Sequence, residues 1–263
     1  MNTIARAKVA LWKKSGLEHD AKGYVNDARK NLLPGVVPEM IKADFCRGRG
    51  QEWLGKIRAI HSSAALAANT FGRWKTEPEK LKLVGLSGFQ SPALEAQCRT
   101  GLVGTPPNLD VLLQSSNVVI GIESKFLELL TPKMPKFTAS YSRGRLPLCE
   151  NTWWSFLEHV SHMPKSHLDA AQLIKHYLGL RKQFSHGKRV FLLYLYWKPF
   201  NAEAFPEYAH HDEDLYKFQN AVQSSDAVHF IAMDYLTLWK GWEKDKHMGQ
   251  HAKLLMNRYS VEI

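Results

Sequence analysis

Two carboxylates and a lysine, carried by two neighbouring strand-like runs, are the residues of this sequence best suited to chemistry. Asp110 lies in the first run, and Glu123 and Lys125 lie in the second. Because successive side chains of a strand point to opposite faces, Glu123 and Lys125 must share one face. Two carboxylates beside an amine can hold a Mg²⁺ ion and promote the attack of water on a phosphodiester.

The alternation of side chains along 118–126 indicates which face of this strand enters the core. The face opposite Glu123 carries apolar side chains with one small polar member: Val118, Ile120, Ile122, Ser124 and Phe126. We expect that face to enter the core, and Glu123 and Lys125 to face a pocket or solvent. Hairpin pairing would bring Asp110 alongside them, although the sequence leaves the register open. The main-chain carbonyl of Ser124 would then be a third oxygen ligand for a metal held by the two carboxylates.

A structural interpretation of the same residues stays open. Opposite charges on neighbouring strands commonly form exposed ion pairs, each contributing roughly 0–1 kcal/mol. Asp20 and Lys22 repeat the acid-x-lysine spacing outside any strand-like run, so the spacing also arises by chance. Residue types and spacing alone therefore favour a nuclease site and a structural cluster about equally, and the surrounding elements must decide.

Helices and strands alternate around these residues. The hydrophobic periodicity predicts helices over 4–14, 20–31, 51–69, 153–161, 168–184 and 213–224 and from 236 onward, and strands over 81–89, 93–98, 108–113, 118–126, 190–197 and 228–233. This order is typical of an α/β fold in which helices flank a mixed β-sheet. We expect a single domain with a helical N-terminal accessory segment (1–46), a catalytic core (47–200) and a C-terminal α/β extension (201–263).

The composition narrows the class of protein. Of the 263 residues, 44% are hydrophobic and 11% are aromatic, which excludes a disordered chain. No apolar run is long enough to cross a bilayer, so we expect no membrane partner. Lysine and arginine number 35 against 25 aspartate and glutamate, a net charge of +10 that favours a polyanion such as nucleic acid. The three cysteines lie far apart, and we expect reduced thiols in a cytoplasmic protein.

The order of these motifs resembles the PD-(D/E)XK nuclease superfamily. Residues 107–110 are similar to its first motif and residues 123–125 to its second, although two residues separate the proline from the aspartate. Segments 61–69 and 104–110 resemble a restriction-endonuclease-like branch of the superfamily. The resemblance covers about 51–197 and implies a core of helix, strand meander, helix and strand. It also implies Mg²⁺-dependent hydrolysis of phosphodiester bonds, in which Mn²⁺ can substitute.

The predicted helix at 168–184 carries a further motif. Gln172 resembles the glutamine of the helix motif in exonuclease-type members of the superfamily, and His176 lies one helical turn further along. A surface pair of polar side chains explains these two residues equally well. Many members add an acid from the helix before the meander, where Glu52 fits best and Glu95 is the alternative. Glu52 is equally well explained as a charge near a helix N-terminus.

The leading hypothesis is therefore a Mg²⁺-dependent endonuclease or exonuclease that acts on DNA in restriction, defence or repair, with an RNA substrate left open. Asp110, Glu123, Lys125 and Gln172 are the expected catalytic residues, and Glu52, Glu95 and His176 are possible auxiliary residues. A homodimer would suit cleavage of two strands. The rival hypothesis is a catalytically inactive nucleic-acid-binding protein on the same fold. A third interpretation is a protein-interaction subunit, which would bind neither metal nor DNA.

Overall fold

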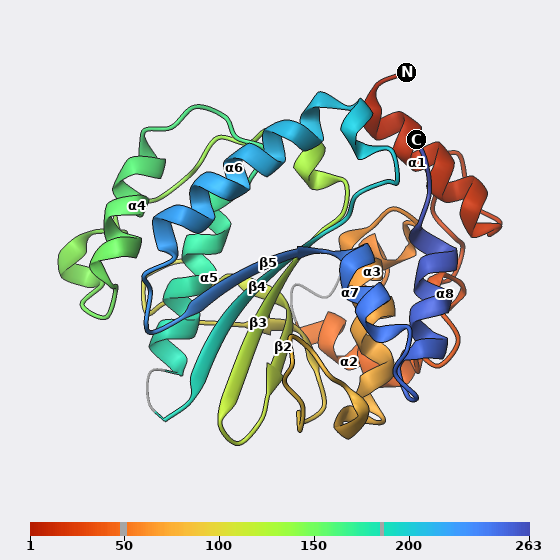
Figure 1. The fold of residues 1–263 in the computed structure, drawn as a ribbon, viewed down its shortest axis with the longest axis horizontal. Coiled ribbons are helices and arrows are strands. Elements are labelled where there is room, and N and C mark those ends of the chain that lie inside the picture. The colour runs from red at the N-terminus through yellow and green to blue at the C-terminus, as the bar shows by residue number, and fades with distance from the viewer. Residues whose placement is uncertain (48–51, 185–186) are drawn as a thin grey trace.

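The fold is built on one mixed β-sheet. The computed structural model describes residues 1–47, 52–184 and 187–263, and within these ranges the sheet has five strands in the order β1-β2-β3-β4-β5 (Figure 1). The strands are β1 (Ala93–Gln97), β2 (Asn108–Gln114), β3 (Val118–Lys125), β4 (Arg189–Tyr196) and β5 (His229–Asp234). The first three form an antiparallel meander, and β3, β4 and β5 run parallel to one another.

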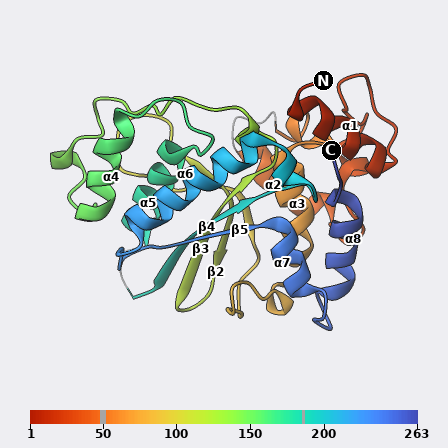
Figure 2. The same ribbon diagram turned by 45° about the horizontal axis from the view of Figure 1, so that its top comes forward.

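Helices cover both faces of the sheet and enclose two hydrophobic clusters (Figures 1 and 2). One face carries α1 (Thr3–Ser15), α2 (Pro38–Arg47), α3 (Ser63–Phe71), α7 (Tyr235–Trp242) and α8 (Gly249–Tyr259). The other face carries α4 (Asn151–Ser161), α5 (Ala170–Gln183) and α6 (Pro206–Val222). The α/β class with a mixed sheet flanked by helices is therefore as expected. Over the described ranges, every helix is too short or too polar to cross a membrane.

The central strand β3 is buried along its whole length, and a glycine allows its neighbours to approach closely. A Cβ atom at Gly121 would lie only 2.8 Å from side-chain carbons of Leu109 in β2 and of Leu180 in α5. A larger residue there would force the side chains of Leu109 and Leu180 to shift. Glycine thus allows these side chains of β2 and α5 to pack closely over β3, where the expected site residues lie.

The helix predicted over 51–69, whose first residue Gln51 lies outside the described residues, is wrong in its first half. Lys56–Arg58 form only a short 3-10 turn, and the α-helix begins at Ser63. Ser62 ends the preceding loop in an extended conformation, and its side chain accepts a main-chain N–H of the first helical turn. The two serines therefore mark a helix start, because serine favours the N-cap over the helix interior.

Two other sequence-based expectations are wrong for related reasons. The segment 20–31 begins as a turn, in which the Asp20 carboxylate accepts two main-chain N–H groups, and only Ala28–Asn31 is helical, as a 3-10 turn. The strand predicted over 81–89 is a tight turn closed by two main-chain hydrogen bonds. In both segments local hydrogen bonds replace the regular element that the apolar pattern indicates.

Candidate active site

The predicted site residues gather where β2 and β3 separate. The ladder between these strands ends at the pair Val111–Ile122. Beyond it, Oδ2 of Asp110 accepts the main-chain N–H of Ser124 at 2.6 Å. A carboxylate thus takes the place of the next main-chain acceptor, because the strands are diverging. This bond draws the side chain of Asp110 to the carboxyl end of β3, which ends at Lys125.

Glu123 is the buried centre of the group, with an exposed fraction of 1%. Its Oε1 lies 2.5 Å from Nζ of Lys125, and its Oε2 lies 2.7 Å from Nε2 of His176. Lys125 also donates a hydrogen bond of 2.9 Å to Oε1 of Gln172. Both Gln172 and His176 come from α5, whose first turn is capped by the side chain of Asp169. The structure therefore brings together Asp110, Glu123, Lys125, Gln172 and His176.

The surroundings shift the pKa values of Asp110, Glu123 and Lys125 in different directions. Burial, reinforced by the negative charges of Glu123 and Glu95, raises the pKa of Asp110 well above its usual range, although this side chain keeps partial contact with solvent. Burial also acts to raise the pKa of Glu123, but Lys125 and His176 outweigh it and lower that pKa to about 2. Burial opposes the charge of Lys125, yet the neighbouring carboxylates hold its pKa above the usual range. The surroundings of Asp110 therefore disfavour its negative charge, which an approaching cation would stabilise.

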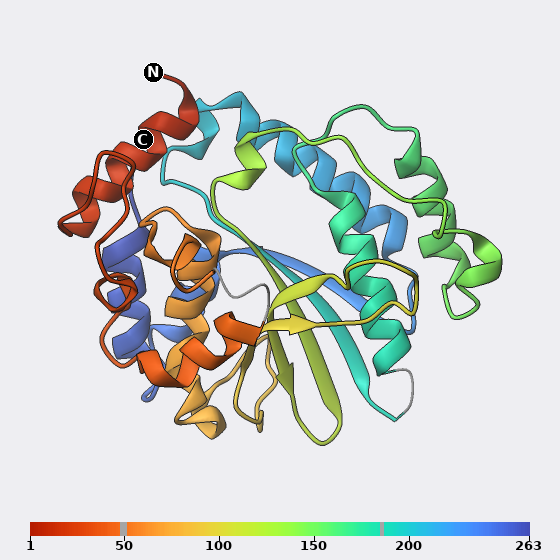
Figure 3. The same ribbon diagram turned by 180° about the vertical axis from the view of Figure 1, so that it is seen from behind.

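Glu95 is a third acid at this position and has a strained backbone. Leu94 pairs with Val111 and Ala96 with Leu109, so Glu95 lies opposite Asp110. Its φ is +50°, a conformation that costs a non-glycine residue of the order of 1–3 kcal/mol. The bend reverses the side-chain alternation: Leu94 packs in the cluster beneath α3, whereas Ala96 packs against the α5 side. Figure 3 shows the chain after β1 continuing beside α5.

Glu52 also lies near the acidic group, but it forms an ion pair with Lys56. Its Oε1 is 2.7 Å from Nζ of Lys56, a lysine whose side chain is 71% exposed. The hydrogen bond with Glu52 raises the pKa of Lys56, and the charges of Glu95 and Asp110 act in the same direction. Burial raises the pKa of Glu95, and the nearby charge of Glu52 raises it further. Both candidates for the auxiliary acid therefore lie within electrostatic range of the group, and the choice between them stays a prediction.

Sequence reasoning missed two features of the site. His176 is fully buried against Glu123, whereas a surface pair with Gln172 was an equally acceptable expectation. Glu128 accepts hydrogen bonds of 2.7 Å from Oγ of Ser63 and from a main-chain N–H just after β3, and its charge acts on Lys125. Its position three residues after Lys125 was the available signal. Together with Lys125, it lines a small recess of about 10 Å³.

Comparison with known proteins adds one match, which covers nearly the whole sequence. Residues 5–260 match the family described as "REase-ARP: Restriction Endonuclease associating with ARP". The chain belongs to this family. The description agrees with the restriction-endonuclease-like resemblance and places the chain among nuclease-related proteins. Neither the curated proteins nor the solved structures gave a match.

The donors at the site of this family member suit a hard divalent cation. Mg²⁺ typically takes one or two carboxylates and keeps several waters, and Asp110 and Glu123 provide that number of carboxylates. Oε2 of Glu123 is buried and makes no well-directed hydrogen bond to any residue in the described ranges, although His176 is close. Within those ranges, no group of three His, Cys, Asp or Glu side chains is arranged to hold a metal ion.

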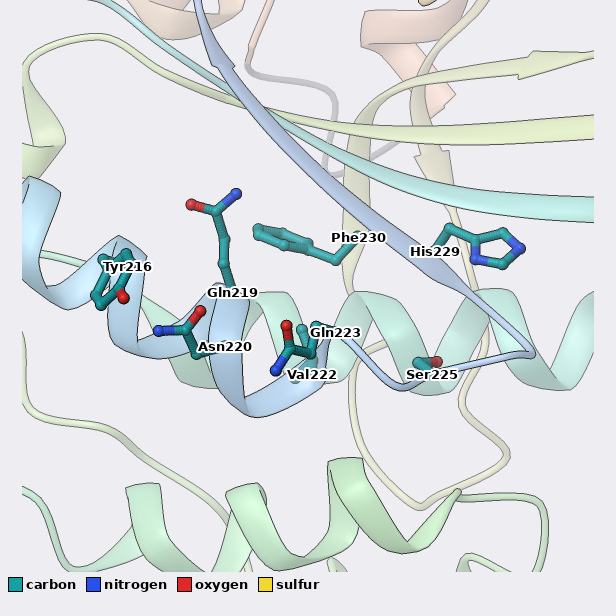
Figure 4. A pocket seen from close by; sticks show the side chains of 8 residues that line it. All are labelled: Tyr216, Gln219, Asn220, Val222, Gln223, Ser225, His229 and Phe230. Carbon is teal, nitrogen blue, oxygen red and sulfur yellow. The ribbon is translucent and has the colours of Figure 1, made fainter.

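A much larger cavity lies at the other end of the sheet. It has a volume of about 410 Å³ between the end of α6 and the start of β5, and Figure 4 shows the side chains that line it, among them Gln219, Asn220 and His229. Since β3 and β5 both run parallel to β4, the amino end of β5 is opposite to the carboxyl end of β3. This cavity is therefore remote from the acids and forms no part of the candidate active site.

Proposed function

We propose that the chain is a metal-dependent nuclease that hydrolyses phosphodiester bonds in DNA. The observation that supports this function best is the convergence of Asp110, Glu123, Lys125 and Gln172 at one end of β3, within a restriction-endonuclease family. A purely structural ion pair needs one acid for each cation. Here the charges of Glu123, Asp110 and Glu128 all act on one buried lysine, and burial together with the charges of Glu123 and Glu95 raises the pKa of Asp110.

Each residue has a role that follows from its contacts. Asp110, Glu123 and the carbonyl of Ser124 would hold Mg²⁺ or Mn²⁺, which supplies a Lewis acid for the scissile phosphate and acidifies water. Lys125 stays protonated and places a positive charge where negative charge increases during attack on phosphorus. Gln172 orients Lys125 through its hydrogen bond, and His176 helps to keep Glu123 ionised.

The direct test is cleavage of supercoiled, linear and single-stranded DNA by the purified protein with Mg²⁺, Mn²⁺ or EDTA. We expect cleavage that requires the metal and that Lys125→Gln and Asp110→Asn strongly reduce. Melting curves of both variants must show that they fold. A folded Lys125→Gln or Lys125→Ala protein with full activity would overturn the assignment. Parallel reactions with RNA decide the class of nucleic acid.

A catalytically inactive nucleic-acid-binding protein is the second candidate, and one observation favours it. Oε1 of Glu123 already lies near Nζ of Lys125 and Oε2 lies near Nε2 of His176, so a metal ion would have to displace one of these side chains. Calorimetry with Mg²⁺ and Mn²⁺ separates the two candidates. Metal binding that Asp110→Asn abolishes supports the nuclease. DNA binding without any metal binding supports the inactive protein.

We also propose a partner protein, a cellular location and an oligomeric state. The family description names an association with ARP, and we propose that this chain likewise acts with that partner in restriction, defence or repair. Cys46, Cys98 and Cys149 are free thiols, which agrees with the reducing cytoplasm. We further propose a homodimer for cleavage of both strands, which light scattering of the purified protein would test.

A further inference from the structure

A small cavity at the far end of α5 is lined by cations. It has a volume of about 80 Å³ and lies between three segments: the loop after β1, the loop before α4 and the last turns of α5. Its polar lining comes mainly from Thr100, Gly101, Arg145, Arg181 and Lys182. Pockets for small organic ligands usually measure about 300–1,000 Å³. This cavity is therefore of a size for a single chemical group.

The segments around the cavity carry positive charge without any carboxylate. Segments 98–107, 131–149 and 175–184 contain no aspartate or glutamate. Their cations are Arg99, Lys133, Lys136, Arg143, Arg145, Lys175, Arg181 and Lys182. The nearest acid in sequence, Glu150, is already occupied by the hydroxyls of Tyr177 and Ser225 and by two main-chain N–H groups. Lys133 pairs with Asp169, and within the described residues the other seven cations form no ion pair with an acid.

The three cations of the cavity are unpaired, and two of them contact the neighbouring loops. Within the described part of the chain, Arg145, Arg181 and Lys182 form no ion pair with an acid. Nε of Arg181 donates to the carbonyl of Leu148 at 3.2 Å, which ties the guanidinium to the loop. Gly101 has a φ of +84°, and a Cβ there would lie 2.8 Å from Cε and 3.0 Å from Nζ of Lys182. Glycine thus allows the ammonium to approach the loop.

We propose that this cavity binds one backbone phosphate of the DNA substrate, away from the scissile bond. The inference rests on the proposed function. Convergent, unpaired guanidinium and ammonium groups suit a phosphate, whose oxygens accept several charge-assisted hydrogen bonds. Their charge also contributes to affinity by displacing counterions from the DNA.

The position of the cavity along α5 relates it to the active site. Gln172 and Lys182 are ten residues apart on one helix, a rise of about 15 Å at roughly 1.5 Å per residue. That length corresponds to about four nucleotides of one strand at roughly 3.4 Å each. Between them, Lys175 lies against the rings of Phe137 and Tyr141 and donates to a loop carbonyl, so the basic loop is anchored along the same helix. A phosphate in the cavity would therefore fix the DNA strand a few nucleotides from the bond that is cut.

The test compares DNA binding by two double variants of the full chain. Arg145→Gln with Lys182→Gln changes the cavity, and Lys13→Gln with Lys14→Gln changes exposed lysines of α1 as a matched control. Fluorescence anisotropy of a labelled DNA duplex in EDTA, over a range of KCl concentrations, gives the slope of log K against log salt. Loss of one phosphate contact makes this slope shallower by about 0.9. We expect that change in the cavity variant and none in the control.

Each other outcome has a defined meaning. An unchanged slope and affinity in the cavity variant, or a wild-type protein that does not bind DNA, would overturn the inference. Inorganic phosphate that raises the melting temperature only when the cavity is intact, with unaltered DNA binding, would assign a small-anion site and also overturn it. A slope change seen with an RNA duplex but not with DNA would do the same. If the double variant does not fold, Lys182→Gln alone must still reduce the slope, since this side chain is exposed.

The same experiments test the proposed nuclease function separately from the phosphate site. Wild-type protein that binds DNA with the cavity-dependent slope but never cleaves it refutes the nuclease and retains the phosphate site. Protein that cleaves DNA with an unchanged slope in the cavity variant retains the nuclease and refutes the phosphate site.

Discussion

Asp44–Lys75 and Glu123–Lys125 are both buried acid–lysine pairs, yet their surroundings differ. The atoms of the first pair are 2.7 Å apart, with exposed side-chain fractions of 3% for Asp44 and 8% for Lys75. Those of the second are 2.5 Å apart, with 1% for Glu123 and 10% for Lys125. Burial and separation alone would therefore assign both pairs the same role.

The two ion pairs differ in the groups that surround them. Asp44 also accepts the N–H of Leu94, and Lys75 also donates to the carbonyl of Pro92, so main-chain groups are among the partners of this pair. Around Lys125 the neighbours are charged: the charges of Asp110 and Glu128 act on this lysine together with that of Glu123. The first pair thus joins α2 and the chain after α3 to the edge of the sheet. The second has more carboxylates than cations, which is typical of functional sites.

The largest effect on stability should come from breaking the first pair. Lys75→Met removes the buried ammonium that lies 2.7 Å from the carboxylate of Asp44, and breaking a buried ion pair costs about 3–5 kcal/mol. Urea denaturation measures the loss. Lys82→Met is the matched control, because Lys82 pairs with Asp245 at the surface with an exposed fraction of 57%, and exposed pairs are worth about 0–1 kcal/mol. Equal losses in the two variants would contradict this view of Asp44–Lys75.

The largest effect on activity should come from Asp110→Asn at the second pair. Asparagine keeps an oxygen that can accept the N–H of Ser124, but it removes a negative charge that its neighbours disfavour. We expect cleavage to fall by about 10²–10³-fold, the usual effect of removing one preorganised electrostatic group, while the metal-free melting temperature stays equal or rises. Plasmid cleavage and thermal melting of the same preparation measure the two effects. A variant that is both active and less stable would place Asp110 in a structural role.

The dependence of stability on pH and metal should differ between wild type and Asp110→Asn. Because the folded-state pKa of Asp110 is raised above 3.8, its contribution is greatest below that value and is lost as pH rises through the raised pKa. Glu123, with a pKa lowered from 4.5 to about 2, loses its contribution only as pH falls through that interval. Metal-free wild type should therefore weaken relative to Asp110→Asn as the pH rises from 3.8 through the raised pKa of Asp110.

Added Mg²⁺ should reverse this difference. A ligand at about 100 times its dissociation constant stabilises the folded state by about 2.7 kcal/mol, and here the effect should grow with pH because metal and proton compete for Asp110. Thermal melts with Mg²⁺ or EDTA measure it. Stabilisation that is the same in Asp110→Asn, or that decreases as pH rises, would show that Mg²⁺ binds elsewhere.

The sheet and the convergence of the site residues were predictable from the sequence, because both depend on local patterns. Strong alternation marks the strands that carry Asp110 and Glu123, and the polar turn between them allows only a hairpin. The helical spacing of Gln172 and His176 already placed them on nearby faces. Their roles as catalytic residues stay a prediction. The burial of His176 was not predictable, since it depends on how closely α5 approaches β3.

The remaining features depend on contacts between distant segments or on single side chains. The cations appeared scattered along the sequence, and only folding places Arg145 beside Arg181 and Lys182. The helix expected over 51–69 depended on apolar spacing, whereas the cap at Ser62 determined where α3 begins. The bend at Glu95 has no sequence signal, because glutamate is an unusual residue for a positive φ.

That bend gives the smallest expected effect and links stability to the second pair. Glu95→Gln removes the charge but keeps the strained φ of +50°, whereas Glu95→Gly removes both. After allowance for the greater freedom of glycine in the unfolded chain, Glu95→Gly should be more stable than Glu95→Gln by about 1 kcal/mol. If Glu95 is the auxiliary acid, both variants lose cleavage equally while Glu52→Gln retains it, and the reverse pattern assigns that role to Glu52. If Glu95→Gly is less stable than Glu95→Gln, the positive φ at residue 95 is not strained. The conformation of Glu95 would then result from packing and not from a functional requirement.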